Sequence, residues 1–283
     1  MKKVAIVILN YRVNKETIEC VGSVKKSDYG DVETIVVDNS PMSGLDKLIE
    51  KYPEVVFIQN KVNLGYCGGN NVGIKEALKM GADYIFILNP DTLVGSSTIG
   101  CLVSAAERHE AGIVAPKILF ADKKTIWYAG GIFDFANVLG GHRGVDETDR
   151  GQYAKEEETD YASGGAMMVS REVFKKIGFF DERYFLYYED SDFSLRSKSA
   201  GFKVVFVPEA VIYHHNAKST GLGSPLQDYF ITRNRMLFAA KFLNLRTRFA
   251  LLREAVGNIN IRARRLALYD FLIGNFGKGS FLK

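Results

Sequence analysis

The sequence predicts an α/β fold in which a mainly parallel sheet is covered by helices on both faces. In roughly the first 120 residues, short apolar runs rich in β-branched side chains alternate with segments of about 10–15 residues that have helical periodicity. The runs are apolar throughout instead of alternating with polar residues, which is typical of strands that are buried on both faces.

The expected elements of this part follow in order along the chain. Strands are expected at 4–10, 33–39, 55–60, 84–91 and 112–120, and helices from Asn14, around 45–49, over 72–80 and over 96–111. Ser43 and Asp46 resemble a capping box before the second helix, and Gly81 is expected to end the third. The glycine-rich stretch "NLGYCGGNNVG" (63–73) is expected to be a loop before that third helix.

The pattern changes after residue 120. The expected elements are a hairpin at 127–135, a polar mobile loop at 142–160, a strand at 161–170 followed by a helix from Arg171, an aromatic strand and helix within 184–201, an extended segment at 203–215 broken at Pro208, and basic helical structure from Asp228. We therefore expect a catalytic domain at 1–225 and a helical extension at 226–283.

The composition is that of an ordinary soluble globular enzyme, with 47% hydrophobic and 25% charged residues. Cys20, Cys67 and Cys101 form no CxxC pair, and three is an odd number, so we expect reduced thiols in a cytosolic protein. The N-terminal apolar run is too short for an export signal, and no stretch reaches the roughly 18 apolar residues that a membrane span needs. These observations predict a cytoplasmic protein.

The net charge of +4 is unevenly distributed. From Ile231 onward, 11 Lys and Arg residues stand against 2 Asp and Glu, whereas the preceding 230 residues carry 26 basic and 31 acidic groups. Basic and apolar residues are mixed in this last segment, as in an interfacial amphipathic helix that binds an anionic membrane surface. A helical subdomain that packs on the core or on another subunit would have the same composition. No zinc-finger or RNA-binding signature is present, so a nucleic acid is not expected.

Polar residues follow three of the predicted strands. Asn10, Asp38 and Asp91 lie where strands end, and in open α/β sheets ligands bind outside the carboxyl ends of the strands. A turn before a helix would explain Asp38, and a turn fixed by Pro90 would explain Asp91. Three such residues on one edge favour a binding site, in which Asp91 would suit Mg²⁺ or Mn²⁺ shared with a substrate phosphate.

Two further stretches have chemical potential, each with a structural alternative. "YYEDSDF" places Glu189, Asp190 and Asp192 within four residues, which should raise at least one carboxyl pKa and suit a general base, although acids also favour the first turn of any helix. His214 and His215 end an extended segment and are either metal or phosphate ligands or structural histidines. The glycine-rich stretch before a helix suits phosphate but matches neither the Walker loop nor the dinucleotide fingerprint.

In its order of motifs the chain resembles family 2 glycosyltransferases with the GT-A fold, especially rhamnosyltransferase-like and galactofuranosyltransferase-like members. The resemblance runs from about Val4 to Thr220 and rests on "VILNY", "IVVDNS", "NLGYCGGNNVGI", "ILNPDT", "ASGGAMMVSREVFKKIGFFDERYFLYYEDSDFSLRSKSAG" and "PEAVIYHH". "YFITRN" (229–234) is similar to that subgroup as well. The resemblance implies a Rossmann-like, mixed but mainly parallel sheet flanked by helices.

The resemblance also implies a metal-dependent hexosyltransferase of polysaccharide synthesis. It would move a sugar from dTDP-rhamnose or a UDP-sugar to a hydroxyl of a glycan or lipid-linked acceptor, and a single base opposite the leaving group would give inversion. Asp190 would be that base, and Glu189 would position the acceptor or the base. Asp91 takes the place of the last acid of the family's DXD motif and would bind Mg²⁺ or Mn²⁺ together with His214, or with His215 as the alternative.

The nucleotide site that the resemblance implies is made of strand-end and loop residues. Asp38 would hydrogen-bond the nucleobase, and Asn89 stands where many members have the first acid of the DXD motif. The full set of implied nucleotide contacts is Asn10, Tyr11, Asp38, Asn63, Gly65, Gly69, Asn70 and Asn89.

Two other classes of protein compete with this hypothesis. A sugar-nucleotide nucleotidyltransferase would need a basic glycine-rich signature after the first strand, and "LNYRVNKETIEC" contains no glycine. A non-catalytic nucleotide-sugar-binding protein would be compatible with Asn89 in the place of an acid. A homo-oligomer and a peripheral contact with the inner face of the cell membrane are left open.

Overall fold

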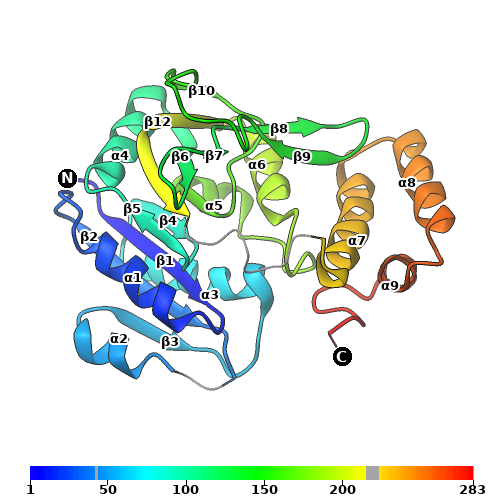
Figure 1. Ribbon diagram of the computed structural model, residues 1–283, viewed down its shortest axis with the longest axis horizontal. Coiled ribbons are helices and arrows are strands. Elements are labelled where there is room, and N and C mark those ends of the chain that lie inside the picture. The colour runs from blue at the N-terminus through cyan, green and yellow to red at the C-terminus, as the bar shows by residue number, and fades with distance from the viewer. Residues whose placement is uncertain (42–43, 215–222, 283) are drawn as a thin grey trace.

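The computed structural model describes residues 1–41, 44–214 and 223–282, and it shows a central sheet with helices on both faces and a group of helices at one end (Figure 1). The strands are β1 Val4–Asn10, β2 Val32–Asp38, β3 Val56–Gln59, β4 Tyr84–Leu88, β5 Thr92–Val94, β6 Ala111–Phe120, β7 Ile126–Tyr128, β8 Gly131–Asp134, β9 Leu139–His142, β10 Glu157–Glu158, β11 Ala166–Ser170 and β12 Lys203–His214. The helices are α1 Asn14–Val24, α2 Asp46–Lys51, α3 Gly65–Lys79, α4 Thr98–His109, α5 Arg171–Ile177, α6 Glu189–Ser199, α7 Pro225–Phe242, α8 Leu245–Gly257 and α9 Arg262–Leu272.

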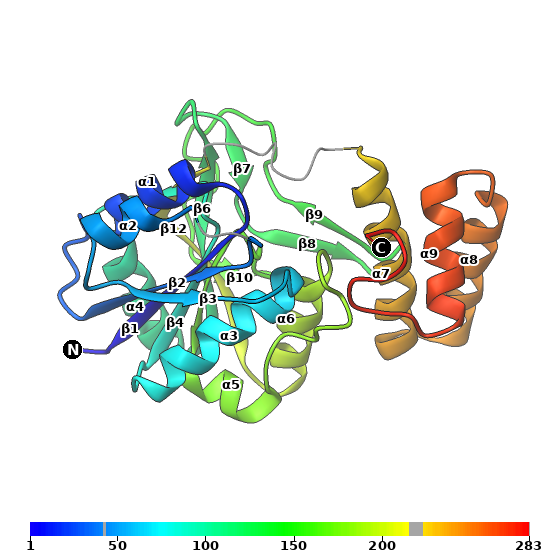
Figure 2. The same cartoon turned by 90° about the horizontal axis from the view of Figure 1, so that it is seen from below.

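The sheet has the strand order β10-β12-β6-β11-β4-β1-β2-β3, with β5 paired to β12 and β7 paired to β6. The pairs among β1, β2, β3 and β4 are parallel, as is β6 with β12, whereas β11 is antiparallel to both of its neighbours. Helix α1 covers one face, and α3, α5 and α6 cover the other (Figure 2). The predicted mixed, mainly parallel sheet flanked by helices is confirmed.

Strand register brings the predicted polar strand ends to one edge. Asn10 of β1 is directly paired with Asp38 of β2, and Ile8 of β1 is paired with Leu88 of β4. Because these strands are parallel, Asn89 follows β4 at the same edge. All seven residues of β1 are buried, which agrees with the continuous apolar run in the sequence.

The glycine-rich stretch is helical, and the prediction of a loop at 63–73 was wrong. Helix α3 begins at Gly65 and includes the rest of the stretch. A Cβ atom on Gly69 would lie 2.4 Å from Leu9 Cδ1, and one on Gly73 would lie 2.4 Å from Val7 Cγ1. The glycines therefore let α3 approach β1 closely, which offsets their poor helix propensity of about 1 kcal/mol each.

Three other predicted elements differ in the structure. The aromatic stretch before α6 is not a strand, because Phe185, Tyr187 and Tyr188 have left-handed backbone angles. The residues expected as one hairpin are divided between β7 and β8, and β8 pairs with β9. Strand β12 continues through Pro208 with a register shift instead of a break.

Two further expectations concern a polar loop and a helix cap. The polar stretch 142–160, expected to be a loop, contains β10 and returns to β7, where the Ile126 N–H donates to Glu147 O at 2.8 Å. Ser43 of the expected capping box lies outside the described residues.

The basic C-terminal segment forms α7, α8 and α9, which pack on one another at the end of the sheet away from β3 (Figure 1). Helix α7 begins at Pro225 and contributes Phe238 to the main core, where its ring lies 4.8 Å from that of Phe133 between centroids. The predicted boundary between a catalytic domain at 1–225 and an extension at 226–283 stays a prediction, because α7 packs into the same core as the sheet.

No helix within the described ranges has the length and apolar character that crossing a bilayer requires. The three cysteines are free thiols.

Candidate active site

The ends of β1 and β2 form a buried polar group. Asn10 Nδ2 donates to Asp38 Oδ1 at 2.9 Å, and the Ser40 N–H donates to the same oxygen at 2.8 Å. Asp38 is fully buried, and its Oδ2 has no hydrogen-bond partner among the described residues. A buried carboxylate oxygen without a donor is unfavourable, so this oxygen is suited to accept a hydrogen bond from a ligand. Tyr11, next to Asn10, is 42% exposed and presents its ring outside this group.

The start of α3 is capped by groups of the protein itself. The Gly65 N–H donates to Asn63 Oδ1 at 2.8 Å, and the Tyr66 N–H donates to Phe185 O at 2.7 Å. Gly65 has a φ of 72°, and an added Cβ would lie 2.5 Å from the Phe185 ring. These N–H groups are the ones that a phosphate at a helix N-terminus would use. Nucleotide contacts by Asn63 and Gly65 therefore stay predictions, and the structure gives both residues a role in holding this turn.

Gly69 and Asn70 lie one turn further along α3. An added Cβ on Gly69 would lie 2.7 Å from Asn39 Nδ2, so this glycine gives room to the polar group at the end of β2. Asn70 is 1% exposed and donates to Tyr66 O at 3.0 Å. Asn70 Oδ1 is buried and has no hydrogen-bond partner within the part of the chain that the structure describes. Their roles as nucleotide contacts stay predictions.

Asp91 and His214 come together from different strands. Asp91 lies in the turn between β4 and β5, and His214 is the last residue of β12, which pairs with β5. His214 Nε2 lies 3.5 Å from Asp91 Oδ1, and both side chains are 4% exposed. The Trp127 ring stacks on the imidazole at 5.0 Å between centroids, with an interplanar angle of 3°. His215 lies outside the described residues.

Asp190 and Glu189 form the first turn of α6. The Gly164 N–H donates to Asp190 Oδ2 at 3.1 Å, and the Ser191 N–H donates to Asp190 Oδ1 at 2.7 Å. Burial raises the pKa of Asp190, and these donors offset part of that effect. Glu189 is only 5% exposed, and its burial together with the charge of Asp190 raises the pKa of Glu189 well above the ordinary value. Asp190 is half-buried, whereas Glu189 is the more deeply buried residue of the pair. The catalytic roles of both residues stay predictions.

A short turn formed by Gly164 and Gly165 connects the Asp91 region to the Glu189–Asp190 pair. The Asn89 N–H donates to Gly165 O at 2.9 Å, and the neighbouring Gly164 contacts Asp190. The Tyr66 hydroxyl donates to Gly164 O and fixes the turn against α3. Asn89, at the start of the turn that contains Asp91, and Asp190, at the start of α6, are therefore bound to neighbouring glycines.

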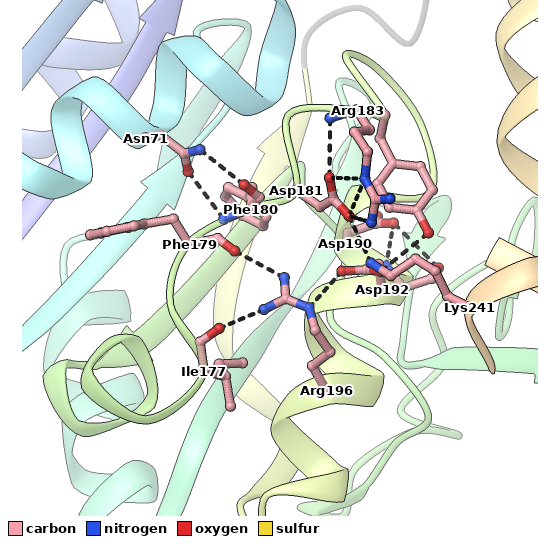
Figure 3. Close-up of polar contacts among 12 residues, drawn as sticks. Asn71, Ile177, Phe179, Phe180, Asp181, Arg183, Asp190, Asp192, Arg196 and Lys241 are labelled. Atoms are coloured by element: carbon pink, nitrogen blue, oxygen red, sulfur yellow. Dashed lines mark hydrogen bonds and ion pairs between the residues drawn. The ribbon is translucent and has the colours of Figure 1, made fainter. Parts of the chain in front are cut away.

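The third acid of the cluster is a structural residue. Asp192 is fully buried, and its Oδ2 accepts a hydrogen bond from Arg196 Nε at 2.7 Å. Its Oδ1 accepts from the Tyr184 hydroxyl at 3.1 Å and forms an ion pair with Lys241 of α7 (Figure 3). Two cations thus compensate one buried carboxylate, and they connect α6 to α7.

The segment that leads into α6 has a strained backbone. Phe185, Tyr187 and Tyr188 have φ values of 65°, 68° and 72°. A left-handed conformation costs a residue other than glycine roughly 1–3 kcal/mol, and it persists only where the surroundings impose it. Such strain gathers at functional sites. This loop directly precedes the Glu189–Asp190 pair.

Three residues of the site were missed by the predictions from sequence. Asn39 Nδ2 donates to Gly65 O at 2.9 Å and joins the β2 edge to α3. Gly164 positions Asp190, and Trp127 stacks on His214. Their sequence signals were the amide in "VVDNS", the double glycine in "ASGGAMM" and the single tryptophan of the chain.

The donor atoms present fit a divalent cation that also binds a substrate. Within residues 1–41, 44–214 and 223–282, no group of three or more His, Cys, Asp or Glu side chains could hold a metal ion. Asp91 and His214 offer two donor groups, and Mg²⁺ or Mn²⁺ commonly takes few protein ligands and completes its shell with phosphate oxygens and water. The fit therefore requires a phosphate-bearing substrate.

Taken together, the fold and the site define a class of α/β protein in which polar strand ends and a buried acid pair meet at one edge of a mixed sheet. The chain belongs to glycosyl transferase family 2, whose profile matches residues 5–178. Residues 152–218 also match the family described as the N-terminal domain of galactosyltransferase.

Known proteins of similar sequence include two named sugar transferases. The chain is 28% identical over 240 residues to the low-salt glycan biosynthesis hexosyltransferase Agl10 of Haloferax volcanii, with 82% of this chain and 74% of that one covered. It is 28% identical over 243 residues to the N-acetylglucosaminyl-diphospho-decaprenol L-rhamnosyltransferase of Mycobacterium tuberculosis, with 76% and 77% covered. The prediction of a family 2 protein similar to rhamnosyltransferases is confirmed.

A solved structure supports the fold. The crystal structure of GalNAc-T7 with UDP, GalNAc and Mn²⁺ matches with a TM-score of 0.63 at 18% identity and covers 83% of this chain. This chain spans about half the length of that protein, since the match covers 51% of it. The likeness shows a GT-A-like fold.

Proposed function

We propose that this chain is an inverting, metal-dependent hexosyltransferase. It moves a sugar from a nucleoside-diphosphate sugar, dTDP-rhamnose or a UDP-sugar, to a hydroxyl of a glycan or lipid-linked acceptor in cell-surface polysaccharide synthesis. The observation that carries the proposal is that the Gly164–Gly165 turn joins two parts of the candidate site. The Asn89 N–H, two residues before the Asp91 that lies beside His214, donates to Gly165 O, and the Gly164 N–H donates to Asp190. One part suits a diphosphate and its cation, and the other suits the proton of a hydroxyl.

The nucleobase is assigned to the buried edge of β1 and β2. Asp38 Oδ1 is held by Asn10 and Ser40, which leaves Oδ2 to accept a hydrogen bond. Uracil and thymine each carry an imide N–H that can donate to a carboxylate. The exposed ring of Tyr11 is suited to cover a planar base beside this edge.

Asp91 and His214 would hold the cation, together with oxygens of the diphosphate. A bound Mg²⁺ or Mn²⁺ supplies positive charge where the leaving nucleoside diphosphate becomes more negative. Asn89 contributes an amide at the place of the first acid of the DXD motif, so the protein offers one negative charge fewer to the cation. The rest of the reaction is assigned to the chain's own carboxyl groups.

Asp190 takes the proton of the acceptor hydroxyl while the hydroxyl oxygen bonds to the anomeric carbon. The bond from that carbon to the diphosphate oxygen breaks in the same step, and the nucleoside diphosphate leaves with its electron pair. General base catalysis of this kind contributes roughly 10²–10⁴-fold in rate. Because burial favours the protonated form of Glu189, we assign it a positioning role instead of attack on the sugar, and a single displacement inverts the anomeric centre.

The test is donor binding followed by turnover. Thermal unfolding is measured with UDP, dTDP and GDP, each with and without Mn²⁺, since a ligand that binds the native state raises its melting temperature. Radiolabelled dTDP- and UDP-sugars are then assayed for transfer or hydrolysis. We expect Mn²⁺-dependent stabilisation by dTDP or UDP and turnover of a matching sugar. Binding without any turnover would indicate a non-catalytic nucleotide-sugar-binding protein.

The exposed surface of α8 and α9 is assigned to a peripheral contact with the inner face of the cell membrane. Leu245, Phe249 and Val256 of α8 are 66%, 67% and 56% exposed, and Arg246 and Arg253 are exposed on the same helix. On α9 and just after it, Tyr269, Leu272 and Ile273 are exposed as well. Apolar side chains mixed with arginines suit the interface of anionic lipids.

Sedimentation with anionic liposomes tests this contact. We expect Phe249→Asp combined with Arg253→Asp to abolish sedimentation, whereas Glu172→Gln on α5, outside the C-terminal helices, leaves it unchanged. A homo-oligomer that uses the same surface predicts a different result, namely that the double variant changes the molecular mass in solution and that neither protein binds liposomes.

A further inference from the structure

Helix α7 carries two buried polar side chains that the proposed reaction does not use. Arg233 and Asn234 are both 0% exposed, although they belong to a segment that sequence reasoning treated as an extension of the catalytic domain. A buried guanidinium and a buried amide are unfavourable unless their N–H groups are hydrogen-bonded. The partners of these two side chains therefore show what the pair stabilises.

Most of the partners are main-chain carbonyl groups of the strained loop before α6, and Arg233 Nη1 also donates to Gly277 O at 2.8 Å. Asn234 Nδ2 lies 3.0 Å from Tyr184 O, 2.8 Å from Leu186 O and 2.8 Å from Tyr187 O. Arg233 Nη2 lies 3.2 Å from Arg183 O and 3.0 Å from Tyr184 O. Two neighbouring side chains of α7 thus bind the carbonyl groups of residues 183, 184, 186 and 187.

Among residues 183–187, the carbonyl group of Phe185 is directed to α3 instead of to α7. Phe185 O accepts hydrogen bonds from the Tyr66 N–H at 2.7 Å and from the Cys67 N–H at 3.3 Å, at the start of α3. The loop is therefore held between α3 and α7. This explains how three left-handed residues other than glycine persist in one short segment.

The path of the loop determines where α6 begins. Tyr188, with a φ of 72°, precedes Glu189, and the Tyr188 carbonyl accepts the first bond of the helix from the Asp192 N–H at 2.9 Å. Only Tyr188 and Glu189 separate the last carbonyl group bound by Asn234 from Asp190. A shift of the loop is therefore passed to the carboxylate of Asp190.

We propose that Asn234 and Arg233 are positioning residues that hold the loop at 183–188 and thereby place Asp190 against the acceptor hydroxyl. This inference rests on the proposed function, in which Asp190 is the base. It makes α7 part of the catalytic unit, although the helix contributes no group to the reaction itself.

The main test is Asn234→Asp, which keeps the volume of the side chain but removes its N–H donors and sets a carboxylate against three carbonyl groups. We expect kcat to fall on the order of 100-fold, the loss that a displacement of about 1 Å can cause in a reacting geometry. The Kd for the nucleoside diphosphate with Mn²⁺ should change much less than kcat, because Asp38 is held by Asn10 and Ser40 and Asp91 lies beside His214. Amide hydrogen exchange should become faster at 183–190.

Arg233→Lys is the milder second variant, and Arg235→Lys is its matched control. Arg235 is on the same helix, but its guanidinium pairs with Glu254 and donates to Asn137 O instead of to a carbonyl group of the loop. We expect Arg233→Lys to lower kcat and to speed exchange at 183–190 to a smaller extent than Asn234→Asp. Arg235→Lys should change neither. If Asn234→Asp does not fold, the kcat and the exchange of Arg233→Lys test the proposal.

The pH profile separates positioning from a general loss of structure. A loosened loop lets water reach Asp190, so the acid limb of kcat should move to lower pH in Asn234→Asp. A variant that is merely less well folded should lose the same fraction of kcat at every pH. An acid limb that does not move in Asn234→Asp would overturn the proposal, and so would a wild-type kcat in Asn234→Asp or Arg233→Lys.

Amide hydrogen exchange also distinguishes a failure of this positioning role from a failure of the proposed function. If the wild-type protein turns over no nucleotide sugar, the proposed function fails, while faster exchange at 183–190 in Asn234→Asp would still show that α7 holds the loop. If Asp190→Asn is fully active, the base is wrong. If exchange at 183–190 is the same in wild type and in both loop variants, the positioning role is wrong.

Discussion

The two halves of the candidate site are built in different ways. In the nucleotide half, Asn10 and Asp38 are the last residues of two adjacent parallel strands and hydrogen-bond across one register step. In the acceptor half, Asp190 follows a strained loop and depends on the Gly164 turn and on buried side chains of α7. Strand register positions the first half by itself, whereas the second half needs contacts from distant parts of the chain. The difference teaches that an acidic residue at the start of a helix that follows a strained loop requires a larger supporting structure than one at a strand end.

The largest expected effect separates the chemical roles of the two halves. Asp190→Asn should lower kcat by roughly 10²–10⁴-fold and leave donor binding intact, because the amide cannot take the proton of the acceptor. Asp38→Asn should instead weaken donor binding with a smaller change in kcat, since it alters the oxygen assigned to the nucleobase. Steady-state kinetics and nucleotide titrations measure both effects. The two halves would not have these different roles if Asp190→Asn turned over normally or if both variants lost donor binding equally.

The next effect concerns the stability of the acceptor half. Arg196→Met removes one of the two cations that compensate the fully buried Asp192, and we expect a loss of about 3 kcal/mol in the free energy of unfolding. The exposed pair of Lys175 and Glu172 provides the control, since Lys175→Met should cost less than about 1 kcal/mol. Urea unfolding measures both. Equal losses in the two variants would mean that Asp192 does not depend on Arg196.

A smaller effect is expected from glycine in the nucleotide half. Gly69→Ala should cost about 1–3 kcal/mol, because the new methyl group would lie 2.4 Å from Leu9 Cδ1 and force α3 away from β1. Gly100 of α4 is the matched control: its nearest neighbour is Tyr29 Cδ2 at 3.8 Å, so Gly100→Ala should be neutral or stabilising by up to about 1 kcal/mol. Thermal unfolding compares them, and a stabilising Gly69→Ala would contradict the close packing.

The smallest effect is a dependence of stability on pH. The folded-state pKa of Glu189 is raised well above its unfolded value by burial and by Asp190, so the folded state binds a proton that the unfolded state releases. The free energy of unfolding should therefore decrease as pH rises from the ordinary Glu value towards the raised pKa. Glu189→Gln should show a smaller decrease, since only the raised pKa of Asp190 then contributes, and the exposed Glu172→Gln should keep the full decrease. Urea unfolding at several pH values measures the slope, and identical slopes in wild type and Glu189→Gln would contradict the raised pKa.

Much of the nucleotide half was predictable from sequence, and little of the supporting structure of the acceptor half was. The strand ends at Asn10 and Asp38 were found because each closes a continuous apolar run. The loop conformation at Phe185 and the start of α3 at Gly65 were missed, since the Phe185 carbonyl that caps α3 lies far away along the chain. Arg233 and Asn234 were noticed only as part of "YFITRN", and nothing in the sequence indicated that they bind the loop before α6.

The sequence by itself determined the class of fold, the rim of strand ends and the acidic pair, because alternating strand and helix periods and strand-terminal residues are local properties. Tertiary structure decided which of the clustered acids is paired with cations and which is not. Asp192 forms ion pairs with Arg196 and Lys241, whereas Asp190 accepts hydrogen bonds from two N–H groups and the Ser191 hydroxyl and is half-buried. Burial and long-range partners set the charge of each carboxyl group, and neither can be read from neighbours in sequence.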